Sequence, residues 1–341
     1  MTPFGLDIGN SSIKLVHLDK KGQDKFALLS AGITQSTVQN VAGALENDLV
    51  TLSETIKKLI ADTKVASRDV NLSLPESSVF TRLVQLPLLT DEEVASAISW
   101  QAEPYIPIPV EQANIDYQIV ERREVNGRDL GGVDVLLVAA PKDLVARYLK
   151  ITKLAGLNVV NIESDLIALS RAIAPQTQTT VLVDVGSSST NIGVIKSGQL
   201  MVSRSIASGG DVLTRAVSTN LSVTPQQAEE YKKTYGLNPQ ALEGKVKQAI
   251  EPAFKLIVEE IKKTIQFYKS DIRKDDQINI VTISGGTAGM AETSTYLATE
   301  LGLEVIIGDP FQKVEKNAST SGQLQSWAPL YSVAVGLAQN I

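Results

Sequence analysis

The stretch Val181-Leu-Val-Asp184-Val-Gly186-Ser-Ser-Ser-Thr190, near the middle of the chain, decides how the rest of the sequence is interpreted. A short β-branched run ends in an aspartate, a glycine and a row of small hydroxyl residues, and 191–195 then resumes as an apolar strand. The pattern predicts two strands joined by a tight turn. Because glycine lets the backbone approach closely and successive N–H groups form an anion-binding concavity, such a turn can cradle phosphate.

The same pattern occurs at the start of the chain, where a strand over 4–8 contains Asp7 and is followed by Gly9, Asn10 and Ser11. Either turn alone is weak evidence, since Asp-x-Gly is common in ordinary turns. Two such hairpins, one opening each half, predict a duplicated architecture with a phosphate chain held between the halves. Lys14 on the second strand is predicted to point back toward a β-phosphate, or else to be a solvated edge-strand lysine.

Asp7 and Asp184 would bring two carboxylates together beside the phosphates. Such a cluster calls for a divalent cation, and oxygen-rich sites of this kind favour Mg²⁺. The sequence therefore predicts a magnesium ion near these two aspartates, held through water.

Length and composition narrow the function classes. The 341 residues are enough for two domains, and the net charge of −6 argues against general nucleic-acid binding. The absence of cysteine excludes disulfides and thiolate metal sites. The N-terminus shows no secretory signal, and the longest apolar run, near 135–140, is too short to span a bilayer, so we expect a cytoplasmic protein.

Periodicity and turn signals predict the secondary structure. Strands are expected over 4–8, 13–18, 26–33, 70–74, 80–86, 116–125, 133–140, 181–185, 191–195, 200–205 and 278–283, and helices over 49–60, 90–100, 144–151, 166–173, 212–221, 225–235, 250–268 and 328–338. The proline-rich stretch 104–109 is predicted to be extended rather than helical, and Asn126-Gly127 and 317–322 are predicted loops.

Three further motifs are candidates for nucleotide contacts. Ser284-Gly285-Gly286-Thr287 follows a strand, and an adenine ring can lie against glycine backbone; an ordinary strand-to-helix turn is the alternative. Glu229 and Lys232 are three residues apart on one helix face, a spacing equally typical of a solvated ion pair. Gly209-Gly210 opens a helix, which suits a phosphate near a positive helix end or simply a tight turn.

Catalytic residues are poorly specified by the sequence. Hydrolysis of a phosphoanhydride needs a residue that orients the attacking water. Glu163 and Asp165 precede the helix expected to cross the site, but an ordinary acid at a helix N-terminus is the favoured interpretation of each. We therefore expect hydrolysis to be slow at most, and whether the chain is an enzyme stays open.

The ordered combination of motifs resembles the actin-like ATPase superfamily, which includes actin, Hsp70, sugar kinases and the cell-division protein FtsA. The resemblance implies an α/β, ribonuclease H-like fold of two domains with ATP and Mg²⁺ between them. The residues that it assigns to the nucleotide are Asp7, Gly9, Asn10, Ser11, Lys14, Asp184, Gly186, Ser187, Ser188, Ser189, Gly209, Gly210, Glu229, Lys232, Gly285, Gly286 and Thr287.

The segment after the fourth strand is similar to the α+β insertion called 1C in FtsA and in the PilM family of type IV pilus assembly proteins. Three stretches carry the PilM resemblance: 83–93, the run 100–117 with its Tyr-Ile-Pro, and 259–268. Family members usually carry an acid where Gln101 stands and Phe where Ile108 stands. The expected domains are 1–77 with 161–178 and 325–341 (domain I, 1A), the insert 78–160, and 179–324 (domain II).

The PilM resemblance implies a cytoplasmic ATP-binding adaptor that holds the N-terminal tail of a PilN-like inner-membrane protein in a groove between 1A and 1C. Tyr105 and Pro107 would border that groove, and the partner would recruit the chain to the inner face of the cytoplasmic membrane. A pilus assembly ATPase and a second copy of the chain are further partners to consider, whereas direct membrane insertion is not expected, because the sequence ends at Ile341 without an FtsA-like tail.

Two other functions stay open from the sequence. One is a filament former like FtsA, and the other is a small-molecule kinase of the same superfamily, which is disfavoured because no acceptor-site base stands in a recognisable context. A related secretion or competence machine is an alternative setting to a pilus.

Overall fold

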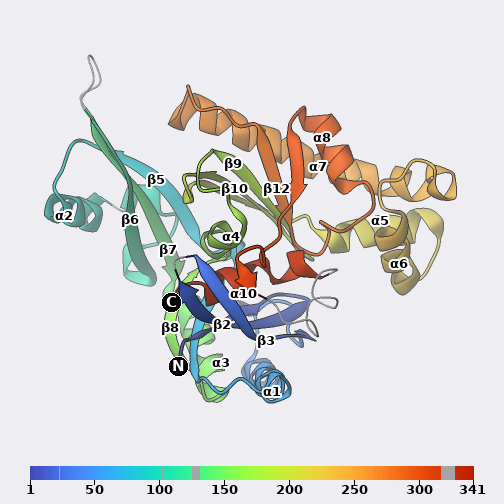
Figure 1. Cartoon of the computed structure of the whole chain (residues 1–341), viewed down its shortest axis with the longest axis horizontal. Helices are drawn as coiled ribbons and strands as arrows, with labels where there is room; N and C mark the ends of the chain where they lie inside the picture. Colours follow the sequence, from blue (N-terminus) through green and yellow to red (C-terminus); the bar gives the residue numbers. More distant parts are fainter. Residues whose placement is uncertain (23, 102, 125–130, 316–326) are drawn as a thin grey trace.

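The computed structural model describes residues 1–22, 24–101, 103–124, 131–315 and 327–341. The loops predicted at Asn126-Gly127 and 317–322 lie outside these ranges. Within the described part, three sheets and the helices around them form two large halves and a smaller insert (Figure 1).

The first half is built on a six-stranded sheet in the order β14-β3-β2-β1-β4-β8. Helices α1 (Glu46–Thr63) and α3 (Lys142–Leu154) pack on it, because Leu52 and Ile56 of α1 and Tyr148 and Ile151 of α3 recur at helical spacing and share one core with the strands. Its strands are β1 (Phe4–Ile8), β2 (Ser12–Gly22), β3 (Lys25–Gln35), β4 (Asp69–Leu74), β8 (Asn158–Ser164) and β14 (Val314–Glu315).

The second half is built on a five-stranded sheet in the order β11-β10-β9-β12-β13. The long helix α7 (Lys245–Phe267) buries Ile250, Phe254, Ile257 and Ile261 along one face, as its periodicity predicts. The other elements are β9 (Thr180–Val185), β10 (Thr190–Lys196), β11 (Gln199–Ile206), β12 (Ile280–Ser284), β13 (Glu304–Ile307), α5 (Gly210–Leu221), α6 (Pro225–Tyr235) and α8 (Thr293–Leu301).

The two large sheets repeat one topology. In each half the first strand pairs antiparallel with the second and parallel with the fourth, and the fifth strand, β8 or β13, adds parallel beyond the fourth. Helices α4 (Asp165–Ile173) and α10 (Ser332–Ala338) lie between the halves and pack on one another (Figure 1). The predicted two-domain actin-like fold with an inserted α+β unit is therefore confirmed.

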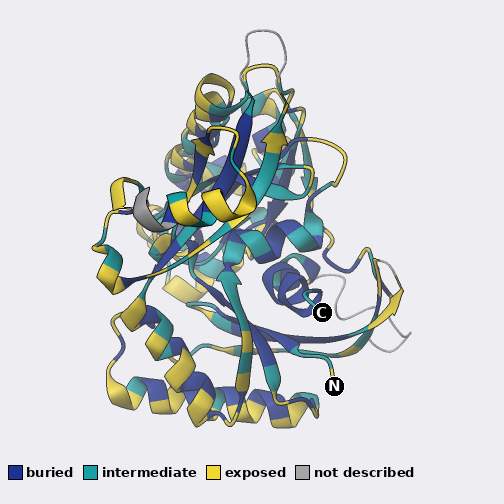
Figure 2. Cartoon of the chain, turned by 90° about the vertical axis from the view of Figure 1, so that its left-hand side faces the viewer, coloured by how far each residue is buried: buried dark blue, intermediate teal, exposed yellow. Residues whose placement is uncertain are grey.

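The insert is a three-stranded antiparallel sheet in the order β5-β7-β6, comprising β5 (Phe80–Leu86), β6 (Ala113–Arg123) and β7 (Gly132–Pro141). Helix α2 (Asp91–Gln101) covers one face through Val94 and Ile98, and Figure 2 views the molecule from this side. The other face is turned toward α4 and the second half, whose core includes Leu83 and Leu136.

The structure corrects some expectations about elements. Residues 103–105 form a 3₁₀ turn, so the prediction that the whole of 104–109 is extended is wrong there; proline is accepted in the first turn of a helix, where its missing N–H has no partner to lose. Strands β8, β13 and β14 were not predicted, and α8 was expected only as a helix of unstated length after Thr287. The last predicted helix begins as a 3₁₀ turn at Ala328–Tyr331 before α10.

The predicted limits of the insert, 78–160, include elements that contact the first half. Helix α3 packs against α1, and β8 pairs with β4 in the first sheet. The division into domains at residue 160 stays a proposal. None of the helices described above is long and apolar enough to cross a bilayer.

Candidate functional site

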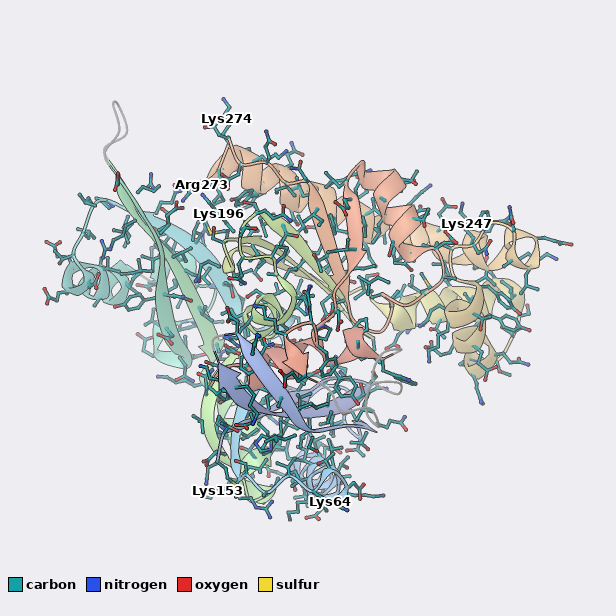
Figure 3. All side chains as sticks on the ribbon, viewed as in Figure 1. Lys64, Lys153, Lys196, Lys247, Arg273 and Lys274 are labelled. Atoms are coloured by element: carbon teal, nitrogen blue, oxygen red, sulfur yellow. The ribbon has the colours of Figure 1, made fainter. Side chains whose placement is uncertain are left out.

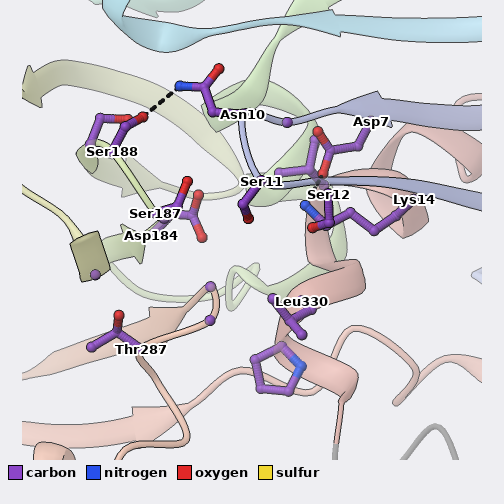
Figure 4. A pocket seen from close by; sticks show the side chains of 18 of the residues that line it. Asp7, Asn10, Ser11, Ser12, Lys14, Asp184, Ser187, Ser188, Thr287 and Leu330 are labelled. Carbon is purple, nitrogen blue, oxygen red and sulfur yellow. Dashed lines mark hydrogen bonds and ion pairs between the residues drawn. The ribbon is translucent and has the colours of Figure 1, made fainter. Parts of the chain in front are cut away.

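A cavity of about 680 Å³ lies between the two halves. It is lined by both phosphate-type turns, by further residues of the first half and of α4, by parts of α5, α6 and the turn after β12 in the second half, and by the C-terminal segment. Figure 4 shows part of this lining. The predicted residues that line it are Asp7, Gly9, Asn10, Ser11, Lys14, Asp184, Gly186, Ser187, Ser188, Ser189, Gly210, Glu229, Lys232, Gly285, Gly286 and Thr287, together with the catalytic candidate Asp165.

The first turn is fixed by the pairing of β1 with β2. The backbone N–H of Gly9 donates to the carbonyl of Ser12 at 3.1 Å and closes the turn. Asp7 and Lys14 are direct partners in the strand register, and Lys14 Nζ lies 3.0 Å from Asp7 Oδ2. Both side chains are nearly buried. The structure thus places Lys14 at the turn, as predicted, rather than on a solvated strand edge.

The second turn has the same construction. Gly186 N–H donates to the Ser189 carbonyl at 3.0 Å, and Asp184 pairs in register with Asn191, as Asp7 does with Lys14. The two turns face each other across the cavity, and Asn10 Nδ2 donates to Ser188 Oγ at 2.5 Å (Figure 4). The backbone and hydroxyl donors of both halves therefore converge on one space.

The start of α5 is docked onto the second turn. The N–H groups of Gly210 and Asp211 donate to the carbonyls of Gly186 and Ser187 at 2.9 and 2.8 Å. These two helix N-terminal donors therefore already have acceptors within the protein. Gly209 does not line the cavity and lies directly behind the turn, against the same two carbonyls.

Lys232 on α6 is buried rather than solvated. Its Nζ donates to Glu229 Oε2 at 2.6 Å, Thr214 Oγ1 at 2.8 Å and the Gly210 carbonyl at 3.2 Å. Partial burial opposes ionisation of Glu229, but hydrogen bonds from Lys232 and Thr214 outweigh it and hold the pKa of this carboxyl below its ordinary value. The pair joins α5 to α6 at the cavity wall.

The turn after β12 meets the C-terminal segment. Gly285 has φ +84°, and a side chain there would meet the Val185 carbonyl at 2.5 Å, so only glycine fits. Ser284 Oγ donates to the Pro329 carbonyl at 3.0 Å, which fixes Pro329 and Leu330 beside Gly285-Gly286. Together with Trp327 they give this end of the cavity an apolar wall.

Three carboxyl side chains, those of Asp7, Asp165 and Asp184, line the cavity and influence one another. Burial raises the pKa of Asp184 to about 6, with Lys14 opposing the rise and Asp7 adding to it. Burial and the neighbouring Asp7 carboxylate also raise the pKa of Asp165 well above its ordinary value, and the Ser73 hydroxyl opposes this. Such clustered, desolvated carboxylates fit a bound cation.

A metal ion would not be enclosed by protein ligands alone. In the described ranges, no three His, Asp or Glu side chains come together closely enough to hold an ion. The two aspartates at the turns fit the predicted arrangement, in which Mg²⁺ is held through water and keeps sites for phosphate oxygens.

Glu163 lies outside the cavity. Arg171 NH1 and NH2 each donate to its carboxylate at 2.7 Å, and Arg171 also donates to the Gly336 carbonyl at 2.7 Å. Both Glu163 oxygens are thereby committed to an ion pair that ties β8 to α4, so Asp165 is the one of the two catalytic candidates that faces the cavity.

Tyr105 and Pro107 lie on the insert, apart from the cavity. Tyr105 is half-buried, with the Arg82 guanidinium 5.6 Å from its ring centre, and Pro107 is exposed. Ile106 between them is buried in the insert's own core.

Several lining residues were not predicted. Ser12 stands within the first motif itself, so its place could have been inferred. The same holds for Asp211, which directly follows Gly209-Gly210, whereas no motif of the sequence includes Ser73, Met290, Trp327 or Leu330.

Comparison with known proteins agrees with this geometry. A family model described as type IV pilus assembly protein PilM matches residues 5–340. The solved structure of a PilM–PilN type IV pilus biogenesis complex is similar over 99% of this chain and 98% of that chain, with a TM-score of 0.83 and 24% identity. MreB5 of Spiroplasma citri bound to AMPPNP is similar over 97% of this chain and 93% of that chain, with a TM-score of 0.53 and 15% identity.

Among curated relatives, the cell division protein FtsA of Bacillus subtilis (strain 168) is 24% identical over 258 residues, which is 68% of this chain and 57% of FtsA. The chain spans little more than half the length of the curated relatives it matches. The fold, the two facing turns and the match over nearly the whole sequence lead to one conclusion: this chain belongs to the family of the type IV pilus assembly protein PilM.

Proposed function

We propose that the chain binds ATP with Mg²⁺ in the cavity between its halves and acts as a cytoplasmic adaptor of a type IV pilus machine. The observation that carries the ATP site is the pair of equivalent turns that face each other across one cavity and are joined by the Asn10–Ser188 hydrogen bond. The adaptor role rests on the family to which the chain belongs.

Separate groups of residues would contact the phosphates, the adenine and the Mg²⁺ ion of the bound nucleotide. The hydroxyls and N–H groups of Ser11 and of 187–189 would bind the phosphates, and Lys14 would leave Asp7 to reach a phosphate oxygen. Gly285-Gly286 and the apolar wall at Leu330 would hold the adenine. A bound Mg²⁺ would supply the positive charge that the Asp7 and Asp184 carboxylates call for.

We propose Asp165 as the residue that orients water for slow hydrolysis. Its carboxyl lines the cavity, and burial and the neighbouring Asp7 carboxylate raise its pKa, which makes it a stronger base toward an attacking water. Glu163 is not proposed for this role, because Arg171 occupies both of its oxygens.

We also propose that a groove between the first half and the insert holds the cytoplasmic N-terminal tail of a PilN-like membrane protein, with Tyr105 and Pro107 at its border. The solved relative with TM-score 0.83 comes from a PilM–PilN complex, which supports a partner of this kind. Binding of that tail would recruit the chain to the inner face of the cytoplasmic membrane.

The test is a calorimetric titration of the chain with a peptide from the N-terminal tail of the PilN-like partner, with and without Mg·ATP. We expect binding in at least one state and weaker binding by the Tyr105→Ala variant. Leu88→Ala, which removes an exposed apolar side chain of the same insert, is the matched control. No binding in either state would contradict the adaptor role.

A further inference from the structure

A cluster of charged side chains joins the insert to the second half, far from the cavity. We call this cluster the clasp. Its members on the insert are Glu121, Arg123 and Asp134, and its members on the second half are Lys196, Arg273 and Asp276.

The centre of the clasp is Asp134 on β7, whose side chain is fully buried. Arg123 Nε donates to one of its oxygens at 3.1 Å, and the Arg273 guanidinium pairs with the other. Arg273 follows the π-helical turn that ends α7, and its own N–H donates to the Tyr268 carbonyl at 2.8 Å. Moving Arg273 away would leave the buried Asp134 carboxylate with one cation fewer, which is strongly unfavourable for the folded protein. The ion pair therefore resists separation of the insert from the second half.

An outer layer surrounds this pair. Arg273 also donates to Glu121 Oε2 at 2.7 Å, and Lys196 Nζ lies 3.5 Å from Glu121 and 3.6 Å from Asp276. Figure 3 shows Lys196 and Arg273 where the second half meets the strands of the insert. Asp276 in turn accepts a hydrogen bond from the Tyr268 hydroxyl at 2.5 Å, which ties the layer to the end of α7.

Apolar packing also attaches the insert to the second half. Leu83 and Leu136, on the face of the insert sheet opposite α2, belong to the core of the second half, and Val120 and Val138 pack against that core. The core of the first half includes Val79 and Ala140, close to where the chain enters and leaves the insert, and Val138 packs against this core as well as against that of the second half.

We propose that the insert moves as one rigid body with the second half, although the chain joins it to the first half at both ends. Closure of the halves around a nucleotide then changes the spacing between the insert and the first sheet. This rests on the proposed function, and it adds a regulation: the nucleotide state sets the width of the groove for the partner's tail.

The chain contains no cysteine, so pairs of engineered cysteines can carry spin labels without background. Asn114→Cys on the insert, Thr299→Cys on the second half and Lys58→Cys on the first half are exposed positions. Pulsed electron-spin distance measurements on the three pairs are made without nucleotide and with Mg·AMPPNP.

With nucleotide, we expect the 58–299 and 58–114 distances to shift together while the 114–299 distance stays constant. A shift of 114–299 with 58–114 constant would overturn the proposal, because the insert would then follow the first half. If the nucleotide binds and none of the three distances changes, the proposed regulation is wrong.

A second comparison tests the clasp without nucleotide. Arg273→Gln is expected to broaden the 114–299 distance distribution, whereas Arg204→Gln, which removes a more exposed arginine–carboxylate pair on the same half, leaves it unchanged. Circular dichroism verifies that both variants are folded, and Glu121→Gln replaces Arg273→Gln if the latter is not. An unchanged distribution in the clasp variant overturns the rigid-body claim.

The tail peptide separates this inference from the adaptor role. In the wild type we expect the peptide affinity to differ with and without Mg·ATP, and in Arg273→Gln the ratio of the two affinities to approach one. Absence of peptide binding would contradict the adaptor role while the distance measurements still decide the rigid-body claim.

Discussion

At the scale of single residues, the two turns show how far spacing alone can predict chemistry. Asp7 and Lys14 are partners because the turn between their strands is short, and the same register pairs Asp184 with Asn191. Both aspartates could therefore be placed at one site from the sequence. The burial of Lys232 and the position of Leu330 could not, since each depends on segments distant in the chain that fold against it.

The proposed binding of Mg·ATP should depend on pH through the protonation of the Asp184 carboxyl. Its carboxyl has a pKa raised to about 6, so it becomes neutral below that pH and loses its attraction for a cation. We expect Mg·ATP affinity to fall about tenfold between pH 7 and about pH 5 in addition to the titration of ATP itself. Calorimetry on the wild type and on Asp184→Asn measures this; equal pH dependence in both proteins would contradict the assignment.

The ligand-free protein should show the opposite trend in stability. The folded state binds the Asp184 proton more tightly than the unfolded state, whose aspartate pKa is about 3.9. The contribution of Asp184 to the free energy of unfolding therefore decreases as the pH rises from about 4 to about 6. Thermal unfolding of the wild type relative to Asp184→Asn should show this loss over that pH range, and a gain would refute it.

Lys14 offers a test of the first turn. Replacing it by methionine keeps the length of the side chain but removes the charge that faces Asp7 at 3.0 Å. We expect Lys14→Met to weaken ATP binding by about tenfold or more, since a charged hydrogen bond to phosphate is lost. Lys58→Met, at an exposed position on α1, should bind like the wild type. Equal affinity in both variants would show that Lys14 does not contact the nucleotide.

At the scale of elements, the helices between the halves depend on close backbone contact. A Cβ added at Gly336 of α10 would lie 1.8 Å from the Ala168 carbonyl of α4. The sequence predicts α10 as an apolar helix, but its small residues are understood only once α4 and β1 are placed beside it. The parallel strands β8 and β13 were missed because short apolar runs between helices carry little periodicity.

Gly336→Ala is accordingly expected to be strongly destabilising. Neither neighbouring backbone can retreat without separating α4 from α10, so we expect a loss of roughly 3 kcal/mol in the free energy of unfolding. Urea denaturation measures it, with Gly22→Ala as the control, because nothing lies within 4 Å of a Cβ at Gly22. A change below about 1 kcal/mol would mean that α10 packs less closely than described.

One buried acid connects elements from all three parts of the molecule. Glu76 accepts hydrogen bonds from the Leu166 N–H of α4 at 3.2 Å, from Thr81 of β5 at 3.5 Å and from Ser203 of β11. Burial raises the pKa of its carboxyl, and hydrogen bonds from these neighbours oppose the rise. No local pattern marks Glu76, because its partners lie as far as 127 residues away.

At the scale of the whole molecule, the duplication and the insert were predictable, whereas the contacts between parts were not. Two Asp-x-Gly hairpins in equivalent places predict two related sheets, and the change of pattern after the fourth strand predicts an added unit. The clasp brings together Asp134 and Arg273, which are 139 residues apart and unremarkable in sequence. The placement of the insert against the second half depends on such long-range pairs. A single sequence does not identify which residues form them.

The most direct test of the central claim is a calorimetric titration of Mg·ATP into the wild type, Asp7→Asn, Asp184→Asn and the double variant, with Asp62→Asn on α1 as control. We expect one ATP per wild-type chain and an affinity at least about tenfold weaker in each single variant. Since we propose that both carboxylates serve one ion, the double variant should lose less than the sum of the two single losses in binding free energy. Absence of ATP binding by the wild type, or unchanged affinity in both single variants, would contradict a nucleotide held jointly by the two turns.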